Sequence, residues 1–431
     1  MKKRIVIALA VLAVFAAVFV SCQKKSAPPA AAPAPAPAPK EVTLNFWHIQ
    51  TGDNRRIPIE NATRRFEAAN PGVKINIDTY ANDAYKTKLK TMTGSDFPDV
   101  FHSWGGGWLK DFINAGLVGE MTAEAQSVAS LIGQNNVNFA SYGGKIYGLL
   151  YSGTATPVYY NKTLFAKYNL QFPKTLAELD KVAKVFLANK ISPFVVANRS
   201  KWPGAQYFVL LSMRYGGPDV FQRAMDKKIK FTDDAFIKAG NELLRQVKAG
   251  WFPAGANGLN SDQGQDRMMF YQGQAAMMIM TSGTIASIMN ENKDFFDKNL
   301  AIGLYPSIDG YPGKSTDLLS GGNVFSPSSG KNRDIAAKFV AYLASDQQLQ
   351  QELLGTGAIP IRQGLSTDNP IVKDLLAQMA SATYLQNFID QTLSADLAEL
   401  HKDTTQALFG QTMTAVQAAD AMQKAFDAAA K

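Results

Sequence analysis

The sequence predicts an α/β protein built from two lobes. The chain has 431 residues, which is long for one hydrophobic core, so two domains are the default expectation. Residues 42–116 contain two kinds of segment in turn along the chain. In one kind, apolar and polar residues alternate, and in the other, apolar residues recur at helical spacing. Strands that alternate with helices favour a parallel sheet. The hydrophobic content of 46% is typical of a globular chain.

The first part of the folded body shows this alternation most clearly. Val42, Leu44 and Phe46 are separated by polar residues, which is the pattern of a half-buried strand. Further strands are predicted at residues 73–80 and 98–104, and helices at residues 54–69, 84–94 and 107–116. In a parallel sheet, ligands bind beyond the carboxyl ends of the strands.

The remaining elements follow from local signals. A strand that ends in a polar break, residues 152–156, precedes another strand at residues 157–161. Thr175 and Glu178 have the spacing of a capping box, so a helix is predicted to begin there. Helical patterns cover residues 224–250, residues 262–292 and most of the last hundred residues, and short strands are predicted at residues 301–306 and 321–327.

The N-terminus has the pattern of an export signal. A basic start is followed by sixteen apolar residues, 5–20, then by Ser21 and Cys22. The apolar run is shorter than the roughly 20 residues of a spanning helix, so residues 1–21 are predicted to be a signal peptide rather than an uncleaved membrane anchor. The segment resembles a bacterial lipoprotein signal, although Phe19 departs from the usual aliphatic residue. Cys22, the only cysteine in the chain, is then the predicted lipidation site.

A spacer follows the predicted lipid. Within the linker, residues 22–40, the stretch 26–40 is nearly all proline and alanine. Such a segment favours extended polyproline II, and fifteen residues would reach on the order of 45 Å. The prediction is a protein of the cell envelope, anchored to a membrane by its lipid and facing the periplasm or the exterior.

Charge and motifs exclude several functions. Lys2, Lys3 and Arg4 supply three of the net +8 charges, and no run of five basic residues occurs, so a nucleic-acid partner is not expected. The sequence has no G-x-S-x-G elbow, no H-E-x-x-H pair, no Walker loop and no dinucleotide fingerprint. His48, His102 and His401 lack metal-ligand spacing. We therefore expect neither an enzyme nor a bound metal or cofactor.

Seven segments, in order, resemble the carbohydrate-binding type of bacterial extracellular solute-binding proteins, family 1, of ABC importers. They span nearly the whole mature chain: "VTLNFWH" at 42–48, "RRFEAANPGVKINI" at 64–77, "DFPDVFHSWGGGWLKDFINAGLV" at 96–118, "PVYYNKTLFAKYNLQFPKTLAEL" at 157–179, "FYQGQAAMMI" at 270–279, "SPSSGKNRDIAAKFVAYLASDQQLQ" at 326–350 and "GAIPIRQG" at 357–364.

The resemblance implies a periplasmic-binding-protein-like fold, in which two α/β lobes are joined by a hinge that the chain crosses several times. The crossings are expected near residues 152–156, 301–304 and 326–332. The N-terminal lobe would then hold residues 41–152 and 302–328, and the C-terminal lobe residues 153–301 and 329–431. The ligand would lie between the lobes, and a membrane permease would recognise the closed form of a monomer.

Candidate ligand residues come from the strand ends and from the resemblance. Trp47, His48 and Trp104 follow predicted strands and would share one rim of the sheet. In the family, Trp104 matches the aromatic residue that stacks on sugar, and Thr154 matches a polar residue of the first crossing. For each tryptophan, packing in the core is the alternative, and His48 is as well suited to a structural role.

The second lobe departs from the family pattern. Where many members have a stacking tryptophan, this chain has Ser282, Gly283 and Thr284. Trp202 stands in for it, unless it only packs against Pro203. The resemblance adds further candidates in a polar loop, in a glycine-rich strand end and after "GAIPI", although the last could equally pair with a surface carboxylate: Asn198, Gly322, Asn323 and Arg362.

These residue types suit a mono- or oligosaccharide, because aromatic planes cover the apolar face of a pyranose while polar side chains bind its hydroxyls. One alternative is a lipid-anchored glycan-degrading enzyme, which needs two carboxylates about 5–9.5 Å apart. Another is the same fold with a polyol, a glycerol phosphate or a peptide as ligand; the glycines 105–107, close to Lys110, would suit a phosphate.

Overall fold

The computed structural model describes residues 41–429. The predicted signal peptide, residues 1–21, and the linker that begins at Cys22 lie outside the described residues. Over residues 41–429 no helix combines the length and the apolar character that a membrane crossing requires.

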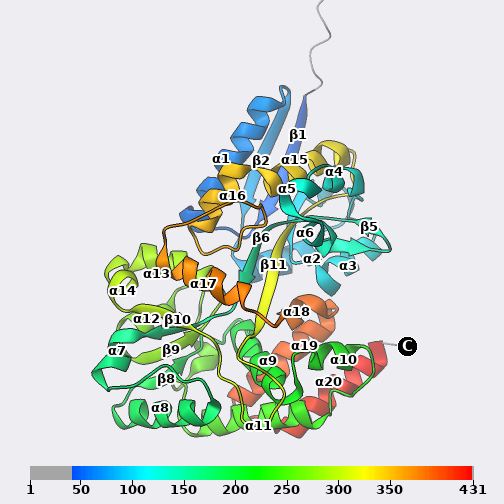
Figure 1. Ribbon diagram of the computed structural model, residues 1–431. Coiled ribbons are helices and arrows are strands. Elements are labelled where there is room, and N and C mark those ends of the chain that lie inside the picture. Colours follow the sequence, from blue (N-terminus) through cyan, green and yellow to red (C-terminus); the bar gives the residue numbers. More distant parts are fainter. Residues whose placement is uncertain (1–40, 430–431) are drawn as a thin grey trace, which may run out of the picture. The chain divides into compact units, whose positions relative to one another are not determined.

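A mixed sheet forms the centre of the first lobe (Figure 1). Its order is β12-β11-β3-β1-β2, and β6 pairs with β11 as well. The first three strands along the chain are parallel, whereas β11 runs antiparallel to both β3 and β6. The strands are β1 (Val42–His48), β2 (Val73–Thr79), β3 (Val100–Ser103), β6 (Leu149–Ala155), β11 (Asp317–Pro327) and β12 (Tyr384–Asn387).

Helices cover this first sheet and enclose an aromatic core. The ring of Phe46 meets Phe325 and Phe339 edge to face, with centroids 4.8 and 5.3 Å apart. The helices are α1 (Asp53–Ala69), α2 (Asn82–Lys90), α3 (Gly106–Asn114), α4 (Thr122–Ser127), α5 (Ala129–Ile132), α6 (Gln134–Val137), α15 (Arg333–Ser345) and α16 (Gln347–Leu354). A small hairpin, β4 (Ser141–Tyr142) and β5 (Lys145–Ile146), lies before β6.

The second lobe is built on a four-stranded sheet of order β10-β7-β9-β8. Its strands are β7 (Val158–Asn161), β8 (Ser192–Val195), β9 (Ala275–Ile279) and β10 (Leu300–Gly303). Its helices are α7 (Lys162–Lys167), α8 (Leu176–Ala188), α9 (Trp202–Gly216), α10 (Val220–Met225), α11 (Asp234–Lys248), α12 (Gln265–Tyr271), α13 (Thr284–Glu291), α14 (Lys293–Lys298), α17 (Pro370–Ala380), α19 (Ala395–Phe409) and α20 (Ala415–Ala429). The short helix α18 (Ile389–Thr392) contacts α19 and, from the first lobe, α3.

Two long strands carry the chain between the lobes (Figure 1). Along β6, Leu150 belongs to the core of the first lobe and Ala155 to a core of the second. Along β11, Leu319 packs in the second lobe and Phe325 in the first. Because β6 and β11 pair with each other over this length, they form a two-stranded ribbon between the lobes. The segment between α16 and α17 returns the chain from the first lobe to the second.

The other two predicted crossings do not match this packing. Residues 301–303 pair with β7 inside the second sheet, and Ser328 bonds to the backbone of Asp99 in the first lobe. The helices over 333–354 pack mainly on the first sheet, not in the C-terminal lobe where the predicted boundary put them, since Phe339 and Leu349 lie in the core of the first lobe. A helical pattern reveals an apolar face but not which sheet that face covers.

The α/β class is confirmed, and most of the predicted elements are present. The helix predicted over 262–292 is wrong in its middle, because residues 275–279 form the fully buried strand β9 between α12 and α13. A short run of buried apolar residues has the same composition in a helix and in a central strand, so its periodicity cannot separate the two.

Candidate functional site

A cavity of about 450 Å³ lies between the two lobes. Its walls are mostly polar and come from loops and helix ends of both lobes. They comprise Ile49, Gln50, Thr51, Gly52, Asn54, Arg55, Asn82, Lys86 and Trp104 from the first lobe; Thr154 and Asn323 from the ribbon; and Trp202, Gln206, Ser261, Asp262, Arg267, Met280, Thr281, Gly283, Thr284, Ser287, Glu291, Phe388, Asp390 and Gln391 from the rest of the chain.

Trp104 brings an aromatic ring from the first lobe to this cleft. It follows β3 directly, and most of the ring is packed against Trp108 and His102, with centroids 5.0 and 4.7 Å away. The side chain is 6% exposed. The ammonium of Lys86 lies 4.5 Å from the ring centroid, so part of the indole surface is already in contact with a cation.

Trp202 brings the second aromatic ring from the opposite lobe. It is the first residue of α9, with Pro203 directly after it, a favourable position because proline has no N–H to leave unpaired in a first helical turn. The side chain is partly buried against the second lobe and lines the cleft together with Gln206, one helical turn further on. The two tryptophans therefore approach one cavity from two lobes.

Hydroxyl and amide groups of the ribbon face the cleft between these rings. The Oγ1 atom of Thr154 lies 3.1 Å from the Oγ atom of Ser282. The Nδ2 group of Asn323 donates to the hydroxyl of Ser152 at 3.1 Å. These bonds fix the positions of two polar side chains that line the cleft, Thr154 and Asn323, close to the point where the chain passes between lobes.

Arg55 and Gly283 meet across the cleft. The Nε group of Arg55, in the first turn of α1, donates to the hydroxyl of Thr356 at 3.2 Å. A Cβ atom added to Gly283 would lie 2.8 Å from the Nη2 atom of Arg55. The guanidinium thus occupies the space that a side chain at position 283 would need. Burial lowers the pKa of Arg55.

Gln50 is a cleft residue that the sequence analysis did not identify. Its Nε2 group donates to the hydroxyl of Tyr151 at 2.7 Å, and its backbone N–H donates to the Nδ1 atom of His48 at 3.2 Å. With the amide nitrogen engaged, the carbonyl oxygen of the side chain remains available to accept a hydrogen bond from a ligand. The strand-end rule already pointed to this loop, because residues 49–52 follow β1 directly.

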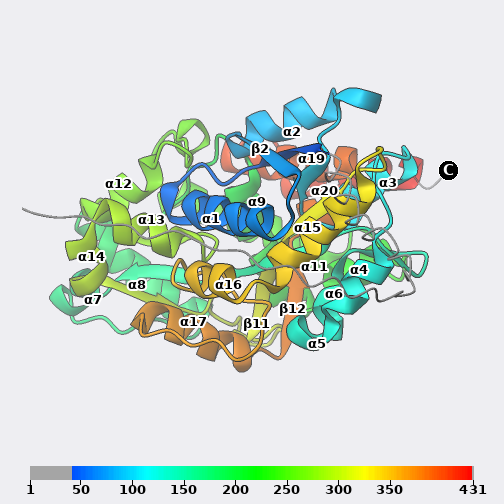
Figure 2. The ribbon, with the colours of Figure 1, turned by 90° about the horizontal axis from the view of Figure 1, so that it is seen from above.

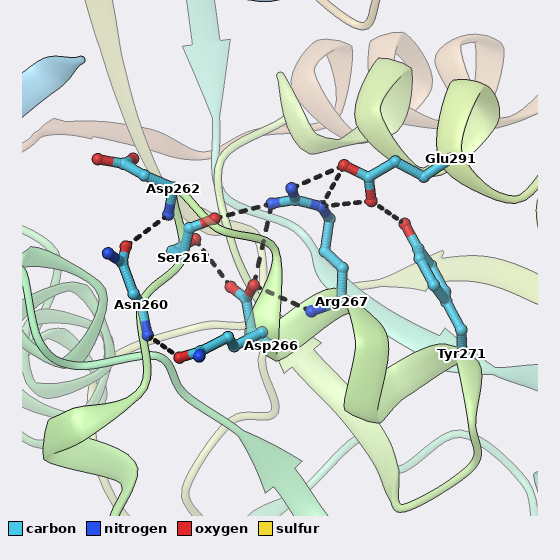
Figure 3. A network of polar contacts seen from close by, with 8 residues as sticks. Asn260, Ser261, Asp262, Asp266, Arg267, Tyr271 and Glu291 are labelled. Carbon is cyan, nitrogen blue, oxygen red and sulfur yellow. Dashed lines mark hydrogen bonds and ion pairs between the residues drawn. The ribbon is translucent and has the colours of Figure 1, made fainter.

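Figure 3 shows a polar network that stiffens the second-lobe wall. Arg267 donates to both carboxylate oxygens of Glu291, at 2.7 and 2.8 Å, and the hydroxyl of Tyr271 donates to the same carboxylate at 2.9 Å. Asp262 contributes only its backbone N–H, and its carboxylate points away from the other side chains (Figure 3). Burial, together with the charge of Asp83, raises the pKa of Asp262.

Besides Ser282, which lies behind Thr154, five of the predicted site residues do not line the cleft. Two of them end β1. Trp47 packs against Tyr80 and has the ammonium of Lys88 4.4 Å from its ring. His48 is fully buried beside Phe46, and burial lowers its pKa to about 3. The strand rule selected the right edge of the sheet, but these two side chains are packed in the wall behind the cleft.

The other three residues have structural partners. Asn198 is buried and donates to Asn257 at 2.7 Å. A Cβ atom at Gly322 would collide with Leu150 and Phe139, so that backbone is covered by apolar groups. Arg362 donates to the carbonyl of Ser345 on the surface of the first lobe.

The remaining six predicted residues gather in one place. Trp104, Thr154, Trp202, Gly283 and Asn323 line the cleft, and Ser282 lies directly behind Thr154. No ligand contact tests their roles, which stay predictions.

Comparisons with known proteins agree with this architecture. Residues 52–350 match the family described as bacterial extracellular solute-binding protein. The multiple sugar-binding protein of Streptococcus mutans is 22% identical over 304 residues, which are 68% of this chain and 69% of that protein. The sn-glycerol-3-phosphate-binding periplasmic protein of Shigella dysenteriae is 25% identical over 78% of this chain and 80% of its own length.

Among solved structures, one comes from a study of xylan utilization by the thermophilic bacterium Caldanaerobius polysaccharolyticus. It is 28% identical, with a TM-score of 0.83, and the match covers 89% of this chain and all of the other.

Proposed function

The chain belongs to the family of bacterial extracellular solute-binding proteins, and from that premise we propose that it captures a mono- or oligosaccharide for an ABC importer. The observation that carries the proposal is the pair of tryptophans, Trp104 and Trp202, which reach one polar cavity from two lobes. The cavity of about 450 Å³ falls within the usual range for small-molecule sites, roughly 300–1,000 Å³.

The cleft has the two kinds of surface that a sugar needs. Indole rings cover the apolar C–H face of a pyranose and add about 0.5–1.5 kcal/mol each beyond simple area burial, by analogy with aromatic pairs. Hydroxyl groups of the sugar meet amides and hydroxyls, which both donate and accept hydrogen bonds, and carboxylates, which accept them. Gln50, Thr154 and Asn323 supply such groups without any movement of the backbone, because each is already held by a neighbour.

Binding between lobes couples the sugar to closure. A ligand that contacts Trp104 on one lobe and Trp202 on the other has its full set of contacts only when the lobes are together. It therefore binds the closed arrangement better and shifts the population toward it. A membrane permease that recognises the closed arrangement would then engage the loaded protein in preference to the empty one.

The family places the protein outside the cytoplasmic membrane. We further propose that a lipid on Cys22 anchors it there, with the Pro/Ala linker as a spacer, and that it acts as a monomer beside its permease. The family supports capture rather than turnover, because its members are described as solute-binding proteins.

A panel of oligosaccharides tests the proposal. Thermal unfolding of the purified protein is measured with each sugar, and the sugar is then recovered and analysed. We expect at least one sugar to raise the unfolding temperature and to be recovered unchanged. New reducing ends would favour the glycan-degrading alternative, and a panel in which only a polyol or a peptide stabilises the protein would contradict the sugar assignment.

A further inference from the structure

Arg55 is a cation of the cleft that has no acidic partner among residues 41–429. Arg267 forms an ion pair with Glu291. The negative charge of Asp390, which also lines the cavity, favours the charged form of Lys86. Within residues 41–429, Arg55 makes no ion pair, and its one side-chain hydrogen bond goes to the neutral hydroxyl of Thr356. Unlike Arg267 and Lys86, Arg55 is therefore a cation of the cleft with no counter-charge among the described residues.

In the part of the chain that the structure describes, no negatively charged group acts on Arg55 either. The ionisable groups that act on it are the phenols of Tyr151 and Tyr159. Burial raises the pKa of both tyrosines, so both are neutral at physiological pH. The Nη2 atom of Arg55 is buried and has no hydrogen-bond partner among the described residues. A buried cation without a counter-charge is unfavourable, and such groups are normally paired or hydrogen-bonded.

The guanidinium of Arg55 lies against Gly283, a position of the other lobe that has no side chain. Gly283 lies directly before α13, and its backbone angles are ordinary helical ones, φ −59° and ψ −22°. No conformational reason therefore requires glycine here. A Cβ atom added at position 283 would meet Arg55 itself, whose Cζ, Nη1 and Nη2 atoms all lie within 3.1 Å of it. Figure 2 shows α1 beside α13, as this contact requires.

We propose that the captured sugar bears an anionic group, a carboxylate or a phosphate, that pairs with Arg55 at the Gly283 end of the cleft. This inference rests on the proposed function and narrows its substrate class. A guanidinium suits such a group because its planar fork of N–H donors matches the oxygens of a carboxylate or phosphate. The Nε group is engaged by Thr356, which leaves the Nη groups for the ligand.

The distribution of acids in the cleft also orients the ligand. The charge of Asp262 interacts with that of Arg267, and the charge of Asp390 with that of Lys86. Neither acid acts on Arg55. The hydroxyl-rich part of the sugar is therefore expected beside Asp262 and Asp390, and its charged group next to Arg55.

Matched pairs of sugars test the inference. Isothermal titration calorimetry on the purified full chain compares neutral saccharides with their uronic-acid and phosphate counterparts, for example glucose with glucuronic acid and glucose 6-phosphate, and cellobiose or xylobiose with aldobiouronic acids. We expect one anionic member to bind about 10- to 100-fold more tightly than its neutral parent, the range of a charge-assisted hydrogen bond. The acid and phosphate arms identify which anion the site takes.

Variants assign the preference to Arg55. Arg55→Met is expected to reduce the anionic-to-neutral affinity ratio to about one, and Arg55→Lys to retain part of it. Arg64→Met is the matched control, because Arg64 is on the exposed side of the same helix and pairs with Glu60; it should leave the ratio unchanged. Thermal unfolding without ligand confirms that each variant is folded.

Three results decide the matter. If the wild-type protein binds neutral sugars as tightly as their charged counterparts, the inference is wrong while the proposed function stands. If Arg55→Met keeps the preference for an anion, Arg55 is not its cause and the inference is equally wrong. If no saccharide binds, neutral or charged, the proposed function fails and the inference fails with it.

Discussion

At the scale of single residues, the side chains that line the cleft are held in place by contacts with neighbouring residues. Trp104 rests on Trp108 and His102, and Gln50 is held by Tyr151. Such preorganisation lowers the entropy that binding must remove, because the ligand meets side chains that are already in position.

Trp202 offers the clearest single-residue test, since it is only partly buried in the second lobe. Trp202→Ala removes one aromatic platform, and we expect the affinity for the bound sugar to fall about tenfold or more. Trp202→Phe keeps a flat apolar face and should retain most of the affinity. Calorimetry on both variants, each checked by circular dichroism, makes the measurement. An unchanged affinity in a folded Trp202→Ala protein would remove this residue from the site.

His401 predicts how stability responds to acid. It is 3% exposed, lies between Phe208 and Phe221, and has no hydrogen-bond partner at Nε2 among the described residues. Burial lowers its pKa to about 4, whereas an unfolded histidine titrates near 6.5. Between these values the unfolded chain binds a proton that the folded chain does not, so the free energy of unfolding falls as the pH falls.

The expected effect of His401 between pH 7.5 and pH 5 is a loss of about 2 kcal/mol. His401→Met, which cannot titrate, should reduce the loss measured by urea denaturation by about that amount, whatever its effect on stability at pH 7.5. Equal pH dependence in the two proteins would show that His401 does not stay neutral in the fold.

The sequence could predict some of these residues and not others for a physical reason. Trp104 and Thr154 are at strand ends, and strand ends are visible in the alternation of apolar residues. His48 is also at a strand end, but its ring turns into the core, which no pattern of spacing specifies. The role of Arg55 depends on a contact with Gly283, more than 200 positions away in the chain, and only the folded arrangement reveals it.

At the scale of elements, the ribbon of β6 and β11 both joins the lobes and contributes to the cleft. Every residue of β11 is buried, so its glycines are there because neighbours approach closely. Above Gly322, a Cβ atom would lie 2.1 Å from the Cδ2 atom of Leu150. Only glycine, which has no Cβ atom, therefore fits at this position of the strand.

Gly322→Ala is accordingly expected to destabilise the protein by about 1–3 kcal/mol, the usual effect of overpacking a buried site. Gly330→Ala is the matched control: it makes the same substitution in an exposed turn, where the nearest atom to the added Cβ is the hydroxyl of Ser328 at 3.5 Å. Chemical denaturation of the two variants gives the comparison. Equal stability of Gly322→Ala and the wild type would mean that β6 and β11 pack more loosely than described.

Elements were predicted well where they are determined by residues close together in the sequence. The capping box of Thr175 and Glu178 is present, with both of its hydrogen bonds, at the start of α8. The strand β9 was harder to predict, because five apolar residues in a row lack the alternation that marks a half-buried strand. Its neighbours β7 and β8 are what make it a strand.

At the scale of the whole molecule, the sequence predicted two lobes and a cleft but not the full path of the chain. Helices α15 and α16 follow the second passage of the ribbon and cover the first sheet, whereas the predicted boundary at residue 329 assigned them to the other lobe. The apolar faces of these helices would suit either sheet. The direction of β11, set by its pairing with β3 and β6, determines where the next helix must pack.

The measurement that tests the central claim most directly is the distance between the lobes with and without sugar. In a Cys22→Ala background the chain has no other cysteine, so cysteines introduced at Ile57 on α1 and Met268 on α12, which are 42% and 52% exposed, can carry a pair of spin labels. Pulsed electron–electron double resonance measures the distribution of distances between the two labels. A sugar that binds should shorten the mean distance and narrow the distribution. A sugar that binds without changing this distribution would contradict capture by closure of the two lobes.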